Sequence, residues 1–414
     1  MSFFIRGLKN SSILLIGRVL GMIISYITLI YIIRELTIDE YGLLTTVRTF
    51  VASFIIFSFG GISGAVMREG SKNISKMGLL YEKTNGFKLL TSIFALILCL
   101  LVLIITPYEF KVKTLIFFFS STIITTSLFN HWLEAFTATE SFKTKVIFKV
   151  AQPLLFFLIA MFVINSTKRV EYLLISQIFL QFLFMIVCLY MSKNLIKFKL
   201  KLNHLYFDKN LITTGIYFFI ISFAGMIFMK SDVLMISLMG SFSDVGVYSV
   251  ADRIAREGSE LRTVIIAGFF PVMIKRIKAG PISGRLVHKT VLKIFLVIII
   301  GVSIFSYNID QIIITLFGNK YLASASILQY LIYFLAIEYT IYPYILLLLS
   351  SNGEKNIAFI YSILAIVNII LNYTFFNIFG LIGIAFSTIT VFMILAIYTV
   401  TFGIKHLYNQ KILI

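Results

Sequence analysis

Six charged side chains lie within a short part of an otherwise apolar stretch, residues 248–270 (YSVADRIAREGSELRTVIIAGFF). They are Asp252, Arg253, Arg256, Glu257, Glu260 and Arg262. Opposite charges recur four positions apart within this set, in the pairs Asp252–Arg256, Arg253–Glu257 and Arg256–Glu260. Residues at that spacing are neighbours on the surface of a helix. The pattern predicts a helix with a charged stripe, which either neutralises itself between packed helices or lines a water-filled cavity.

Four arginines are candidates for binding an anion, because a guanidinium stays charged when it loses water and grips phosphate oxygens through paired hydrogen bonds. They are Arg18, Arg48, Arg253 and Arg256. Neither Arg18 nor Arg48 has an acid three or four positions away. Each of these two residues has an alternative role that stays open. The Arg18 side chain could instead extend to the inner membrane surface, and Arg48 could instead pair with an acid on another helix. The four arginines are expected at different depths in the membrane, so that a diphosphate group could pass from one to the next.

The acids in apolar segments are interpreted as groups that bind a coupling ion or balance the arginines: Asp232, Asp252, Glu257, Glu260 and Glu338. Lys230 is expected to pair with Asp232 or to lie at the membrane surface. A proton or sodium gradient is the energy source that such acids suggest. Cys99 and Cys188 lie in apolar runs, and no metal site or other cofactor is predicted.

The composition is that of a polytopic membrane protein, with 59% hydrophobic residues, 13% charged residues and a mean hydropathy of +0.98. A membrane-spanning helix needs about 20 mostly apolar residues. Twelve segments meet this need: 11–33, 43–66, 89–106, 114–135, 148–165, 172–191, 211–237, 245–272, 291–307, 325–350, 356–376 and 381–404. We therefore expect an all-α integral membrane protein with twelve transmembrane helices.

The net charge of +18 is spread over many short loops, which argues against a nucleic-acid-binding domain and predicts no nucleic-acid partner. If the N-terminus is cytoplasmic, most Lys and Arg residues, Lys88 among them, fall in inside loops, as the positive-inside rule requires. Both termini are therefore predicted to be cytoplasmic. Trp132, near the cytoplasmic end of the fourth span, is interpreted as part of an aromatic belt at the membrane surface. Removing the charged span 245–272 alone would reverse every later loop, so this stretch is expected to cross the membrane.

Three weak sequence matches relate the two halves of the chain. Lys9-Asn10 corresponds to Lys209-Asn210, Gly42 to Gly246, and Lys143 to Lys355, at offsets of 200, 204 and 212. Such repeats are common in transporters, where binding sites lie at the repeat interface. We expect two six-helix halves, residues 1–207 and 208–414, around a cationic central cavity.

Several helix-end patterns occur together: IIRELTIDEYGLL after the first span, SDVLMISLMGSFSDVGVYSVADRI after the seventh, SSNGEKN, NIILNY and GLIGIAFSTIT. With the length and the 6+6 layout, the chain resembles the polysaccharide transporters (Wzx-type O-antigen flippases) of the multidrug/oligosaccharidyl-lipid/polysaccharide (MOP) exporter superfamily. The resemblance implies a MATE-like fold in the bacterial cytoplasmic (inner) membrane. It also implies outward flipping of undecaprenyl-diphosphate-linked oligosaccharide by alternating access, among membrane lipids and alongside a polysaccharide polymerase and a chain-length regulator.

Two other functions are weighed against this expectation. A cation-coupled multidrug antiporter of the same superfamily would need an acidic, apolar-walled cavity, and such proteins usually carry membrane acids in the N-terminal half, where Arg18 and Arg48 stand here. A membrane enzyme, such as an oligosaccharide polymerase or glycosyltransferase, usually needs a long outer loop. Every outside loop predicted here is short, so we expect no enzyme.

Overall fold

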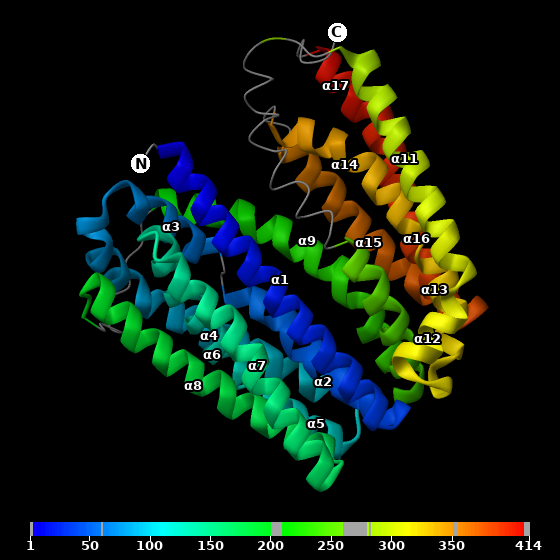
Figure 1. Ribbon diagram of the computed structural model, residues 1–414, viewed down its shortest axis with the longest axis horizontal. Coiled ribbons are helices and arrows are strands. Elements are labelled where there is room, and N and C mark those ends of the chain that lie inside the picture. Colours follow the sequence, from blue (N-terminus) through cyan, green and yellow to red (C-terminus); the bar gives the residue numbers. More distant parts are fainter. Residues whose placement is uncertain are drawn as a thin grey trace. The chain divides into compact units, whose positions relative to one another are not determined.

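The computed structural model describes residues 3–58, 61–199, 209–259, 280, 283–350 and 354–409 (Figure 1). The regular structure in these residues is helical, and no β-strand occurs among them. They form two compact units, Met1–Met226 and Ile227–Ile414. The boundary falls inside α9 (Lys209–Met239). The division at 207/208 that the repeat suggests falls within residues 200–208, which lie outside the described part, and it stays a prediction.

The N-terminal unit begins with the long helix α1 (Phe3–Glu35), which packs along α7 (Phe142–Thr167). The approach is close, since a Cβ added at Gly21 would lie 2.7 Å from the Lys149 carbonyl oxygen. The remaining elements are α2 (Ile38–Ile55), η1 (Ile56–Ser58), α3 (Gly61–Lys72), η2 (Ile74–Lys76), α4 (Met77–Ile105), α5 (Phe110–Phe119), α6 (Thr122–Ala138) and α8 (Val170–Ile196).

The C-terminal unit contains the end of α9 and a helix over residues 242–259, which we call the stripe helix because it carries the charged stripe. In this unit α15 (Glu354–Phe379) lies against α16 (Leu381–Tyr398) (Figure 1). The other elements that follow the stripe helix are α11 (Gly284–Tyr307), α12 (Ile309–Phe317), η3 (Asn319–Tyr321), α13 (Ala323–Leu331), α14 (Phe334–Ser350), α15 (Glu354–Phe379), α16 (Leu381–Tyr398), the π-helical turn η4 (Thr399–Gly403) and α17 (Ile404–Asn409).

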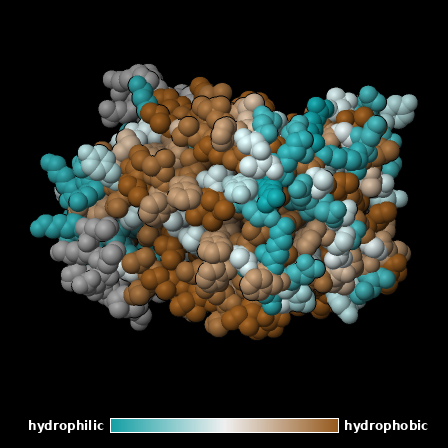
Figure 2. All heavy atoms as spheres, turned by 90° about the horizontal axis from the view of Figure 1, so that it is seen from below, coloured by the Kyte–Doolittle hydropathy of each residue, from teal (hydrophilic) through white to brown (hydrophobic). Residues whose placement is uncertain are grey.

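The described residues contain 11 helical stretches that are long and apolar enough to span a membrane. Many large apolar side chains face outward, such as Ile105 at 84% and Phe162 at 74% exposure, and the face in Figure 2 has broad hydrophobic areas beside hydrophilic ones. Exposing such a surface to water is unfavourable, whereas contact with lipid is favourable. The protein is therefore a multi-pass membrane protein, as predicted.

The predicted spans differ from the helices at their ends. The spans 114–135 and 325–350 each join two shorter helices, α5 with α6 and α13 with α14. The eighth predicted span, 245–272, is helical as far as residue 259, and residues 260–279 lie outside the described part. The count of twelve and the cytoplasmic termini stay predictions.

Matching capping boxes begin α2 and the stripe helix. At α2, the Thr37 hydroxyl accepts from the Glu40 amide at 3.2 Å and the Thr37 amide donates to Glu40 Oε2 at 2.9 Å. At the stripe helix, Ser241 and Asp244 make the same two bonds, at 3.1 and 2.8 Å. Both ends thus satisfy amides that would otherwise lack a partner. These residues correspond at the offset of 204 that links Gly42 with Gly246.

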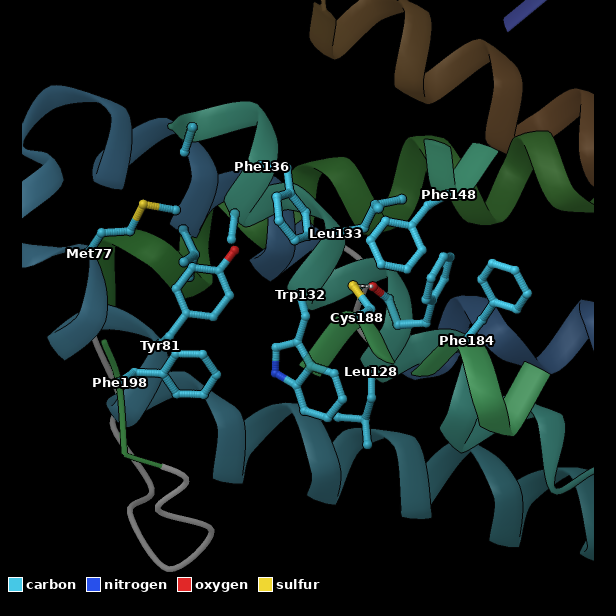
Figure 3. Close-up of a cluster of buried hydrophobic side chains, with 14 of the residues drawn as sticks. Met77, Tyr81, Leu128, Trp132, Leu133, Phe136, Phe148, Phe184, Cys188 and Phe198 are labelled. Atoms are coloured by element: carbon cyan, nitrogen blue, oxygen red, sulfur yellow. Dashed lines mark hydrogen bonds between the residues drawn. The ribbon is translucent and has the colours of Figure 1, made fainter. Parts of the chain in front are cut away.

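An aromatic core holds α4, α6, α7 and α8 together in the N-terminal unit (Figure 3). Trp132 is buried in it, at 4% exposure, and donates its indole hydrogen to Asn85 Oδ1 at 3.0 Å. The interpretation of Trp132 as part of an aromatic belt at the membrane surface was therefore wrong. The amide of Asn85 gives the indole N–H a partner inside the bundle, so the ring has no need of the membrane surface.

Candidate functional site

The C-terminal unit buries a group of polar side chains that we call the Asp232 cluster. At its centre is Asp232 on α9, which is 1% exposed. Around it lie side chains from α9, the stripe helix, α15 and α16: Ser231, Tyr248, Asp252, Arg256, Asn368, Asn372 and Thr388. Four helical segments thus converge on one carboxylate inside an apolar bundle.

Both oxygens of Asp232 accept hydrogen bonds. Asn372 Nδ2 donates to Oδ1 at 2.9 Å, and the Tyr248 hydroxyl donates to Oδ2 at 2.8 Å. The Thr388 hydroxyl also approaches Oδ2, at 3.3 Å. Ser231 is 3.3 Å from Oδ1 but lies closer to Asn368 Oδ1, at 2.7 Å, and a hydroxyl has one hydrogen to give. The carboxylate is held in a fixed orientation by neutral donors.

The hydrogen bonds alone do not offset the free-energy cost of burying an ionised Asp232. Moving a carboxylate out of water costs several kcal/mol even after the surrounding protein relaxes. A hydrogen bond to a charged group contributes roughly 1.5–3 kcal/mol. The bonds from Tyr248 and Asn372 therefore offset much of the cost, and a positive charge close to Asp232 stabilises the ionised form further.

Arg256 supplies part of that positive charge. Its Nε donates to Asp252 Oδ2 at 2.7 Å, and its Nη2 lies 3.7 Å from Asp232 Oδ2. Arg253 pairs with Glu257 at 2.8 Å on a more exposed side of the stripe helix, where the Arg253 side chain is 46% exposed. Both pairs were predicted from the four-residue spacing and are confirmed. Glu260 and Arg262, the remaining members of the predicted stripe, lie outside the described residues.

Lys230 does not pair with Asp232, contrary to the first of its two predicted roles. In the described part of the chain the partners of Asp232 come from other helices and from Ser231, while Lys230 is half-buried on α9. Residues two apart on a helix point in different directions, so closeness in sequence was misleading. Lys230 lies instead within electrostatic range of Asp252, Arg253 and Arg256.

Glu338 is buried on α14, at 7% exposure, in the same unit as the Asp232 cluster. The next residue, Tyr339, donates its hydroxyl hydrogen to the Gly258 carbonyl at 2.7 Å. This bond fastens α14 to the last described turn of the stripe helix. The predicted role of Glu338 in coupling or charge balance stays a prediction.

In the N-terminal unit, Arg48 projects from α2 between α7 and α8. Its Nε donates to Gln177 Oε1 at 2.9 Å, and its guanidinium carbon lies 5.3 Å from the centre of the Phe156 ring. An amide oxygen and an aromatic face both interact favourably with a guanidinium cation. Arg48 is half-buried, so it is positioned to act as a fixed cation within its helix bundle.

Arg18 lies on α1 next to the close contact with α7. Its side chain is exposed, and its charge is near enough to repel that of Lys149 on α7. Arg18 and Arg48 belong to one unit, and Arg253 and Arg256 to the other. The structure groups Arg256 with Asp232 and Asp252. The predicted ladder of four arginines across both halves stays a prediction.

Lys88 is a buried cation that the sequence placed in a cytoplasmic loop. It lies inside α4, at 1% exposure, and donates from Nζ to the Ser58 carbonyl at 2.8 Å. Ser58 ends η1, where helical carbonyls lack partners within the helix. The loop assignment was wrong because α4 begins at Met77, well before the apolar segment that marked the predicted span.

The sequence did not indicate which neutral residues complete the Asp232 cluster. Asn368 and Asn372 stand four positions apart in the apolar helix α15, within the NIILNY pattern, and are 2% and 0% exposed. Two amides on one face of a membrane helix are a signal in their own right, since polar groups in lipid need partners. What they bond to depends on how α9 and α15 pack.

Comparisons with known proteins place the fold. The family described as polysaccharide biosynthesis protein matches residues 7–277. An inward-facing multidrug resistance MATE transporter of the MOP superfamily is 13% identical, with 94% of this chain and 95% of that chain covered and a TM-score of 0.73. The inward closed lipid II flippase MurJ is 14% identical, with 98% and 88% covered and a TM-score of 0.68.

A third structure, a MOP superfamily transporter from Pyrococcus furiosus whose binding pocket has reversed polarity, is 12% identical over 98% of this chain and 96% of that one, with a TM-score of 0.59. No curated protein sequence matches. The solved structures named here are transporters and a flippase, and the chain shares their fold. The family match spans more than half of the sequence, and this multi-pass membrane protein with the MOP-superfamily fold therefore belongs to the polysaccharide biosynthesis protein family.

Proposed function

We propose that the protein is a flippase in the bacterial cytoplasmic membrane. Its substrate is an oligosaccharide linked to undecaprenyl diphosphate, such as an O-antigen repeat unit, which it carries from the cytoplasmic to the outer leaflet by alternating access. The family supports a role in polysaccharide biosynthesis, and a flippase of another lipid-linked saccharide is among the structures with the same fold. Polymerase and chain-length regulator are the partners that such a role implies.

The observation that carries this proposal is the distribution of charge between the units. Among the described residues, the buried acids are Asp232 and Glu338, and both belong to the C-terminal unit. The N-terminal unit instead buries Lys88 and contains the half-buried Arg48, which donates to Gln177. Cationic groups inside a membrane protein attract an anionic headgroup such as a diphosphate.

Asp232 is the residue we assign to coupling. It is an ionisable group inside a transporter, where such groups commonly bind the driving ion. Its neighbours offer further oxygen atoms, from Asn368, Asn372 and Thr388. Oxygen ligands suit hard cations, so sodium fits this donor set, and a proton is the other predicted driving ion.

The multidrug antiporter is the competing function. It would use acids in the N-terminal half, and in the described part of that unit the buried charged side chain is a lysine. A cationic bundle repels the cationic dyes that such antiporters export. The two functions therefore predict opposite substrates for the same protein.

Proteoliposomes distinguish these functions. The purified chain would be reconstituted with a fluorescent undecaprenyl-diphosphate oligosaccharide, and the label reaching the outer surface would be measured with a membrane-impermeant quencher. Ethidium efflux would be measured in the same vesicles. We expect lipid transfer without dye efflux, and dye efflux without lipid transfer would refute the proposal.

A further inference from the structure

Arg256 is shared unequally between two carboxylates. Its Nε forms a short bond with Asp252, at 2.7 Å, while Nη2 lies 3.7 Å from Asp232 Oδ2, beyond hydrogen-bond distance. Nη2 is also 3.5 Å from the Phe228 carbonyl oxygen. The guanidinium is thus hydrogen-bonded to Asp252, and its interaction with Asp232 is a longer electrostatic contact.

The charges within the Asp232 cluster do not balance. Two carboxylates, Asp232 and Asp252, face one guanidinium when both acids are ionised. Lys230 lies in electrostatic range of Asp252 but forms no ion pair with either acid in the described part of the chain. One further positive charge would therefore be stabilised next to Asp232.

Asn372 Oδ1 is an oxygen atom of the cluster that could act as a ligand of that cation. Asn372 Oδ1 is buried and has no hydrogen-bond partner, although its own Nδ2 reaches Asp232. A buried carbonyl oxygen without a partner costs about 1–3 kcal/mol. A cation beside Asp232 would provide the partner that this oxygen lacks.

We propose that Arg256 is an internal counter-ion that competes with a sodium ion for Asp232, and that sodium binding releases the Arg256 charge from Asp232 while Asp252 keeps its side chain in place. This inference rests on the proposed assignment of Asp232 to coupling. Like charges a few ångströms apart in a poorly solvated site repel strongly, so sodium and the guanidinium cannot both neutralise the same oxygen.

The competition would couple the driving ion to an anionic substrate. When sodium occupies Asp232, the Arg256 guanidinium has one carboxylate partner in place of two, and its positive charge is less neutralised. Binding of the cation then favours binding of a diphosphate, and by thermodynamic linkage the diphosphate favours the cation by the same factor. Arg256 is a positioning residue in this scheme, since it acts on the cation through Asp232.

The test is sodium binding to the purified full-length protein in detergent. The dissociation constant is measured with radioactive sodium at constant ionic strength, with choline replacing sodium. Arg256→Gln should tighten sodium binding by about tenfold or more, because a repelling charge is removed. Asp252→Asn should weaken it, because the guanidinium loses its tether and moves onto Asp232.

Two further variants serve as controls for the removed charge and for folding. Arg285→Gln removes the same charge from an exposed position on α11 and should leave the dissociation constant unchanged. Arg256→Lys keeps the charge and should bind sodium no more tightly than the wild type. If Arg256→Gln elutes as an aggregate, Asp252→Asn still decides the question, because competition predicts weaker sodium binding by this variant and a purely structural ion pair predicts no change.

Equal sodium affinity in the wild type and Arg256→Gln would overturn the competition, as would tightening in Asp252→Asn. Absence of sodium binding in every chain would also overturn it. Failure of the proposed function leaves a different signature. If sodium binds and Arg256→Gln tightens it but no lipid is transferred in vesicles, the competition stands and the flippase assignment does not.

Discussion

The Tyr248 hydroxyl donates to Asp232 Oδ2 over 2.8 Å, and both side chains are fully buried in the C-terminal unit. The bond joins the stripe helix to α9 around an ionisable group, so the packing of two membrane helices and the state of one carboxylate depend on each other.

Removing this hydroxyl should destabilise the protein with little change in shape. Tyr248→Phe leaves Asp232 Oδ2 without its shortest neutral donor, and we expect a loss of about 1.5–3 kcal/mol. The measurement is thermal unfolding in detergent. Tyr307→Phe makes the same change at a residue that is 91% exposed and should leave the melting temperature unaltered. Equal melting temperatures for both variants would show that the Tyr248 bond contributes nothing.

Asn372→Ala should abolish the stabilisation of the protein by sodium, because it removes both the donor to Asp232 Oδ1 and the unpartnered oxygen Oδ1. The measurement is the shift in melting temperature between sodium chloride and choline chloride. Asn377→Ala, on the same helix at an exposed position, should keep the wild-type shift. An unaltered sodium shift in Asn372→Ala would exclude this amide from the site.

Arg48 should be needed for transfer of the lipid-linked substrate but not for folding. Arg48→Ala removes a charge held by Gln177 and Phe156, so outward transfer in vesicles should fall to background while expression stays near normal. Arg48→Lys keeps the charge but loses the planar fork, and we expect partial activity. Arg34→Ala, an exposed arginine one helix earlier, serves as the control. Full transfer by Arg48→Ala would remove Arg48 from the proposed anion-binding set.

Gly383 marks a point where α16 meets the end of α15 too closely for a side chain. A Cβ there would overlap the Phe375 carbonyl oxygen, whereas nothing lies within 4 Å of a Cβ at Gly301 on α11. Gly383→Ala should therefore destabilise the protein, and Gly301→Ala should stabilise it by up to about 1 kcal/mol through helix propensity. Thermal unfolding of the two variants gives the comparison. A rise in melting temperature for Gly383→Ala would show that the two helix ends separate easily.

The sequence determined the parts of this account that depend on local spacing or on length. Apolar runs of sufficient length predicted membrane helices, and the four-residue spacing predicted the pairs Asp252–Arg256 and Arg253–Glu257, because both properties reside in a single helix. The resemblance to MOP-superfamily transporters was confirmed by the family match and by the fold.

The candidate site was only partly predictable, because it depends on packing between distant helices. A pair between Lys230 and Asp232 was one of two expectations, but the partners Asn372 and Thr388 of Asp232 lie more than a hundred positions along the chain. Lys88 was assigned to a loop because hydropathy reports apolar length and not where a helix begins. The first error comes from treating neighbours in sequence as neighbours in space, and the second from treating the apolar part of a helix as the whole helix.

The central claim is tested most directly by the ion dependence of lipid transfer in Asp232→Asn. Proteoliposomes with a sodium or proton gradient, and without one, would contain wild-type protein, Asp232→Asn, or Asp310→Asn as a control at an exposed acid of α12. We predict that one of the two gradients accelerates transfer of the undecaprenyl-diphosphate oligosaccharide by the wild type and by Asp310→Asn, and that Asp232→Asn shows no acceleration. Gradient-driven transfer by Asp232→Asn at the wild-type rate would contradict the account.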